Sequence, residues 1–204
     1  MKKMGTIIIL VVFLLCCVEA TIVLYNLGFW SFPLPKRNFA PRDLLLTVED
    51  LGEGWSVLYD HGYPMGNYST ILEQWNRHFV YKLDSQDRLK LENFVYRCDN
   101  KQHAKAHFRE EKLYSGKYPA PEELQALFQP QYADEWLLFG DAGYAAVYDE
   151  YFILFNLRSV LYYLQEGLGG DIRDGVISYE QIANWLKLLD ERAGQLIGKA
   201  GKNR

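Results

Sequence analysis

The first 35 residues contain the feature that most limits what this chain can become, a long apolar run. Between Lys3 and Lys36 the only charged residue is Glu19, and residues 7–30 are mostly apolar. As a helix, these residues would extend about 36 Å at 1.5 Å per residue, which is enough to cross a hydrocarbon core of about 30 Å. We therefore expect a single N-terminal transmembrane helix that holds the chain in a lipid bilayer through residues 7–30.

The same run also has the features of a secretory signal. A short basic head precedes the apolar residues 6–18, and Val18-Glu19-Ala20 offers a cleavage site after Ala20 that would release a secreted form. The apolar character resumes after this site and continues to residue 30, which favours an uncleaved signal-anchor. Such a segment normally exports the domain C-terminal to it, so we expect the C-terminal domain outside the cytoplasm. Glu19 would be costly inside the bilayer unless it is protonated or paired with another helix.

The remainder of the chain is predicted to form one domain. We expect an anchor over residues 1–34, a proline-rich extended spacer over 35–42, a single domain over 43–198 and a polar tail over 199–204. The 204 residues are 49% hydrophobic and 24% charged, which is typical of a globular domain. The 22 basic residues are outnumbered by 26 acidic ones, so there is no broad basic surface for nucleic acid.

The periodicity of the domain alternates between helix and strand. We expect a short helix near Thr47, a helix from a cap at Asp99 and Gln102 to about Tyr114, and strands whose side chains alternate in polarity. The predicted strands are "WSVLYD", "ILEQWNRHFVYKL", "RLKLENFVYRC", "EWLLFG", "YAAVYDE", "YFILFNL" and "SVLYYLQE". On the second of these, one face is predicted to carry Ile71, Trp75, Phe79, Tyr81 and Leu83.

The last part of the domain is predicted to be a long amphipathic helix. Its apolar stripe repeats every three or four residues and comprises Ile182, Trp185, Leu186, Leu189, Ala193, Leu196 and Ile197. The predicted fold class is therefore α+β, a mostly antiparallel sheet covered by two main helices and preceded by one N-terminal transmembrane helix.

The order of these elements resembles a known group of exported domains. A short helix ending at Gly-Trp, "VYRCDNKQHAKAHF" as strand into helix, "FGDAGYAAV" and a terminal "LLDER" helix are similar to exported α+β domains of bacterial lipoproteins and sensor proteins. The resemblance covers about residues 44–197. Since the roles of those domains are mostly unknown, the resemblance implies a location more than an activity.

Two motifs have features of metal sites. "DGVIS" resembles part of a calcium-binding loop. When Gly175 is aligned with the glycine of that loop, only Asp174 and Ser178 place side-chain oxygens at the expected ligand positions. Ser178 and Gln181 are better explained as the cap of the following helix. Cys98, His103 and His107 have types and spacing that suit zinc, which makes a zinc-dependent hydrolase the alternative function. The sequence otherwise predicts no catalytic residue and no cofactor.

The segment "YDHGYPMGNY" is predicted to be an aromatic loop between two strands. Tyr59, Tyr63 and Tyr68 could meet a protein or a sugar there, because tyrosine combines an apolar ring with a hydroxyl group. The favoured function is therefore a non-enzymatic, membrane-tethered binding or assembly module, an accessory subunit of a membrane complex with a protein partner.

Overall fold

The computed structural model describes residue 19 and residues 39–64, 70–82, 88–159 and 177–201. The chain separates into two units, Met1–Pro35 and Lys36–Arg204. In the first unit only Glu19 is described, as a helical and exposed residue, so the rest of the predicted anchor lies outside the described residues, as do residues 35–38 of the spacer. Within the described residues, no helix has both the length and the apolarity needed to span a membrane.

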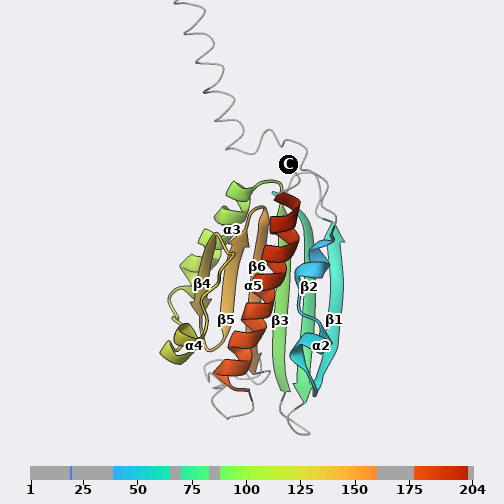
Figure 1. Cartoon of the computed structure of the whole chain (residues 1–204), viewed down its shortest axis with the longest axis vertical. Helices are drawn as coiled ribbons and strands as arrows, with labels where there is room; N and C mark the ends of the chain where they lie inside the picture. The colour runs from blue at the N-terminus through green and yellow to red at the C-terminus, as the bar shows by residue number, and fades with distance from the viewer. Residues whose placement is uncertain (1–18, 20–38, 65–69, 83–87, 160–176, 202–204) are drawn as a thin grey trace, which may run out of the picture. The chain divides into compact units, whose positions relative to one another are not determined.

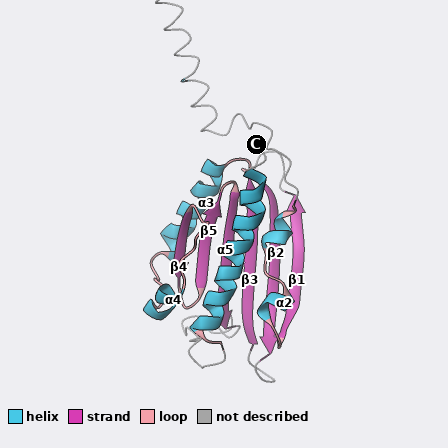
Figure 2. Cartoon of the chain, in the orientation of Figure 1, coloured by secondary structure: helices cyan, strands magenta, loops and turns pink. Residues whose placement is uncertain are grey.

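The second unit is built on a six-stranded antiparallel sheet (Figures 1 and 2). The strands are β1 (Trp55–Pro64), β2 (Ile71–Lys82), β3 (Arg88–Cys98), β4 (Glu135–Phe139), β5 (Gly143–Tyr148) and β6 (Tyr151–Ser159), in the order β1-β2-β3-β6-β5-β4. Two meanders therefore join where β6 pairs with β3. The prediction of an α+β fold with a mostly antiparallel sheet is confirmed, whereas the predicted strand "SVLYYLQE" lies outside the described residues apart from Ser159, the last residue of β6.

The centre of the sheet is buried on both sides. Every residue of β5 is buried, with Tyr144, Ala146 and Tyr148 in one apolar cluster and Ala145 and Val147 in a second. Because successive side chains of a strand point to opposite faces, these two clusters lie on opposite sides of the sheet. The first cluster includes α5 (Tyr179–Gly201) and the second includes α3 (Lys101–Ser115), so α5 crosses the front in Figure 1 and α3 lies behind.

The helix α5 confirms the predicted amphipathic stripe. The residues of that stripe are buried, apart from the half-buried Leu196, and Ser178 Oγ accepts a hydrogen bond from Gln181 N at 3.2 Å, as expected for a helix cap. The helix α3 buries Ala104 and Phe108. The predicted cap of α3 is wrong by one residue, because Asn100 Oδ1, and not Asp99, accepts the bond from His103 N at 3.0 Å.

The segment before β1 packs beside α5 as an apolar strap on the same side of the sheet (Figure 1). It contains η1 (Pro41–Leu44) and α2 (Val48–Leu51), and its residues Leu44, Leu45 and Leu46 are fully buried. The predicted helix start at Thr47 is confirmed, since Thr47 and Asp50 form a capping box. A further short helix, α4 (Glu122–Leu127), begins directly after Pro121.

The prediction for the face of β2 is correct for its central residues and wrong at its start. Trp75, Phe79 and Tyr81 pack on the α5 side as expected. Ile71 packs instead against the cluster of α3, because the register shifts between Ile71 and Glu73. An irregularity of this kind inserts a residue and reverses the alternation of side chains beyond it. Leu83 lies outside the described residues.

Candidate functional site

The three residues of the predicted zinc site each lie in a different local environment. Cys98, at the end of β3, is fully buried. Burial, helped by the charges of Asp99 and Glu150, raises the pKa of the Cys98 thiol to about 12. The neutral thiol is a poor nucleophile and a poor metal ligand at pH 7.

The two histidines point to separate partners. His103 Nδ1 bonds Asp99 and lies 3.0 Å from Asn100 Nδ2, whereas His107 Nε2 bonds Thr70 Oγ1 at 3.1 Å. Among the residues that the structure describes, no three His, Cys, Asp or Glu side chains are grouped in a way that could hold a metal ion. The structure therefore does not bring Cys98, His103 and His107 together as a site.

The predicted tyrosine loop is in part a strand. β1 continues to Pro64, so Tyr59, His61 and Tyr63 follow one another along the same side of a strand, and Tyr68 lies outside the described residues. The prediction of a loop is wrong here because the pairing of β1 with β2 extends to Pro64 and Glu73. The hydroxyl groups of Tyr59 and Tyr63 are hydrogen-bonded to each other, and this bond is the main reason that the pKa of Tyr59 is raised.

Strand pairing aligns these side chains with others on β2 and β3, on the side of the sheet away from α5. We call this surface the open face. Its three cross-strand rows are Tyr59–His78–Glu92, His61–Asn76–Phe94 and Tyr63–Gln74–Tyr96. The contacts of α3 are mainly with β3 to β6, and on β2 its cluster includes Ile71 at the start of the strand, so the described part of α3 lies mainly over the other half of the sheet. Tyr63 is 42% exposed, His61 is exposed, and the remaining residues except Glu92 are half-buried.

Aromatic rings touch one another across the open face. The ring centroids of Tyr59 and His61 are 6.0 Å apart, those of His61 and Tyr63 are 4.6 Å apart, and those of Tyr59 and His78 are 5.3 Å apart. Contacts continue through Phe94 to Tyr96 at 6.3 Å. Rings at these separations stabilise one another, so they form a cohesive surface and not a set of loose side chains.

One end of the open face carries charge that is neutralised internally. Glu92 is only 6% exposed and binds both Lys90, at 2.8 Å, and Arg158. Burial lowers the pKa of the neighbouring His78, with a further contribution from Lys90, so His78 is neutral at pH 7. Burial also raises the pKa of Tyr96 to about 12.

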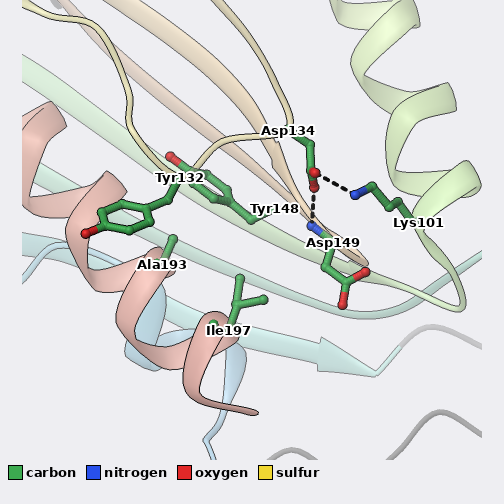
Figure 3. Close-up of a pocket in the computed structure, with 9 residues that line it drawn as sticks. Lys101, Tyr132, Asp134, Tyr148, Asp149, Ala193 and Ile197 are labelled. Carbon is green, nitrogen blue, oxygen red and sulfur yellow. Dashed lines mark hydrogen bonds and ion pairs between the residues drawn. The ribbon is translucent and has the colours of Figure 1, made fainter. Parts of the chain in front are cut away.

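A second concavity lies between the start of α3, the β5–β6 turn and α5 (Figure 3). Lys101 Nζ bonds Asp134 at 2.5 Å, and Asp134 also accepts the N–H of Asp149 at 2.8 Å. Burial alone would raise the pKa of Asp134, but these two hydrogen bonds, together with the charges of Lys101 and Lys105, outweigh it and hold the pKa below its ordinary value. The cavity volume of about 200 Å³ is smaller than the roughly 300–1,000 Å³ of most ligand sites.

Buried polar groups beneath this concavity have a structural role. Asp190 of α5 accepts hydrogen bonds from Tyr148 Oη at 3.0 Å, Gln131 N at 2.7 Å and Tyr132 N at 3.2 Å. Tyr148 also bonds Tyr144 at 2.8 Å, and burial raises the pKa of both tyrosines far above the usual value. These groups join the helix, the sheet and the loop before β4, so we assign them to stability.

Seven residues of the open face were not predicted as site residues. They are His61, Gln74, Asn76, His78, Glu92, Phe94 and Tyr96. Within "YDHGY" the aromatic residues recur at every second position, and this period is the signal for a strand with an aromatic side. The alignment with β2 and β3 depends on the strand register, which one sequence does not reveal.

Comparison with protein-family models, with curated proteins and with solved structures found no match for this chain. The resemblance to exported domains of bacterial lipoproteins and sensor proteins therefore remains a prediction.

Proposed function

We propose that this chain is a non-enzymatic, membrane-tethered binding module that works outside the cytoplasm. In this proposal residues 7–30 hold it in the bilayer, Glu19 pairs with another protein within the membrane, and the open face holds a ligand. The chain would then act as an accessory subunit of a membrane assembly, and its protein partner would be met through the anchor.

The main observation behind the proposal is that the two halves of the sheet are not equally buried. β5 and most of β6 are buried on both sides, whereas the open face presents aromatic and amide side chains over β1 and β2. Exposed aromatic clusters are uncommon on monomeric proteins and often mark interaction sites. Nearly neutral aromatic and amide groups suit recognition more than they suit catalysis.

The chemistry of the described residues supports binding over reaction. A cysteine ligand of zinc must be deprotonated, and in this chain the Cys98 thiol is buried with a raised pKa. In the concavity of Figure 3, Lys101 and Asp134 are paired with each other. No observation on the described residues favours the zinc-dependent hydrolase over the binding module.

Site-specific labelling tests the role of the open face. Tyr63→Cys and Leu188→Cys each place a thiol at an exposed position, the first on the open face and the second on α5. In native cell envelopes we expect slow maleimide labelling at position 63, which becomes fast after purification, and equal rates at position 188 in both states. Peptide mass spectrometry separates these sites from the native cysteines. Equal labelling of position 63 in envelopes and in the purified protein would contradict the proposal.

The proposed pairing of Glu19 with another protein within the membrane is tested separately. Glu19→Leu removes the intramembrane carboxyl group, and Glu19→Gln keeps its size and part of its hydrogen-bonding capacity. In native gel electrophoresis of mild detergent extracts, we expect Glu19→Leu to shift the chain from a larger complex to a smaller species, with Glu19→Gln less affected. A single small species for the unaltered chain would remove the assembly role.

A further inference from the structure

The open face is too small to hold a folded protein by itself. From Tyr59 to Tyr63 it extends about 14 Å along β1, and from β1 to β3 it extends about 10 Å, at roughly 3.4 Å per residue and 4.8 Å per strand. Stable protein interfaces bury about 800 Å² on each partner, which is several times the area of this surface. The dimensions therefore suit a narrow, extended ligand.

The functional groups on the surface combine aromatic rings with amides. Tyr59, His61 and Tyr63 line one edge, and next to them Gln74 Nε2 donates a hydrogen bond to Asn76 Oδ1 at 2.9 Å. Rings pack against the C–H faces of a pyranose, whereas amide and phenol groups can both donate and accept hydrogen bonds with sugar hydroxyls.

The charge of the surface argues against a highly charged ligand. Apart from Glu92, the open face consists of aromatic, histidine and amide side chains, and Glu92 binds both Lys90, at 2.8 Å, and Arg158. Proteins that bind polyanions use several basic groups to neutralise the ligand. A nearly neutral surface is complementary to a nearly neutral ligand.

We propose that the open face binds a neutral, linear, β-1,4-linked oligosaccharide, which lies across Tyr59, His61 and Tyr63 and hydrogen-bonds Gln74 and Asn76. This inference rests on the proposed function, because it names the ligand of the same surface. A membrane-tethered module of this kind would hold its assembly beside a polysaccharide outside the cytoplasm.

The test is calorimetric titration of the full-length chain with cellohexaose and with chitohexaose. A phosphocholine detergent is needed, because glucoside and maltoside detergents would themselves present sugar rings. We expect saturable binding of at least one hexasaccharide, at least tenfold weaker binding for His61→Ala and Tyr63→Ala, and unchanged binding for Leu188→Ala. His61 and Tyr63 are exposed strand residues, and circular dichroism checks that their variants fold.

Two results would contradict the proposal that the ligand is an oligosaccharide. One is no binding of either hexasaccharide by the folded chain, and the other is binding that His61→Ala and Tyr63→Ala leave unchanged. If the titration fails while position 63 is still protected in native envelopes, the ligand class is wrong and the binding module stands. If that protection is also absent, both proposals fail.

Discussion

Asp190 provides the sharpest test of how this domain is held together. Its side chain is 3% exposed and accepts hydrogen bonds from Gln131 N at 2.7 Å, Tyr132 N at 3.2 Å and Tyr148 Oη at 3.0 Å. Asp190→Ala would leave three donors without this acceptor. Each buried donor left unsatisfied costs about 1–3 kcal/mol. Tyr148 keeps its bond to Tyr144, so we expect a total loss of about 3–5 kcal/mol of unfolding free energy.

The measurement is equilibrium and thermal unfolding of the detergent-solubilised chain, followed by circular dichroism. For a domain of this size, a loss of about 3–5 kcal/mol lowers Tm by about 6–20 °C. Asp190→Asn retains one acceptor oxygen and should lose roughly half as much. Glu191→Ala removes the neighbouring carboxylate, which is exposed, and should change the stability by less than about 0.5 kcal/mol.

The relative unfolding free energies of these variants test the explanation. If Asp190→Ala unfolds within about 1 kcal/mol of the unaltered chain, the three hydrogen bonds do not join α5 to the loop before β4 as described. If Glu191→Ala is as destabilising as Asp190→Ala, the loss belongs to the helix in general and not to the buried acceptor.

Three further measurements test other parts of the structure. Arg192 donates to both oxygens of Asp50, at 2.8 and 2.7 Å, so Arg192→Ala should lower the unfolding free energy by about 2–3 kcal/mol in urea titrations, and Arg192→Lys should lose less. The Cys98 thiol is buried and its pKa is raised to about 12, so iodoacetamide at pH 8 should label it only in denaturant, and rapid labelling of the native chain would contradict this. The folded-state pKa of His78 lies below its ordinary 6.5, so the unfolded chain binds the proton more readily and stability should fall as the pH drops below 6.5. In unfolding experiments from pH 7 to 5, His78→Gln should reduce this slope, and an unchanged slope would refute the assignment.

Local patterns predicted most of the elements of this domain. The apolar stripe of α5 repeats with the helical period, and the cap formed by Ser178 and Gln181 depends only on residues three apart. The short helix at Thr47 was predictable for the same reason. Predictions that depended on an exact register were less successful, as the shift after Ile71 shows.

The same distinction between local sequence pattern and tertiary contacts applies to the predicted site residues. The types and spacing of Cys98, His103 and His107 suit zinc, but side-chain direction places the thiol in the core and gives the two histidines to different partners. The aromatic side of β1 is present in the sequence as a period of two. Only the pairing of β1 with β2 and of β2 with β3 aligns it with His78, Phe94 and Tyr96.

The sequence by itself determined where most of the helices and strands form, because capping, helical period and strand alternation act between residues close along the chain. Only the tertiary structure decided which side of each strand is covered. β3 pairs with β6 across the join between the two meanders, and α5 and α3 then bury opposite sides of the same sheet. Burial is a property of packed neighbours far apart in sequence, so the open face appears only when the whole sheet is assembled.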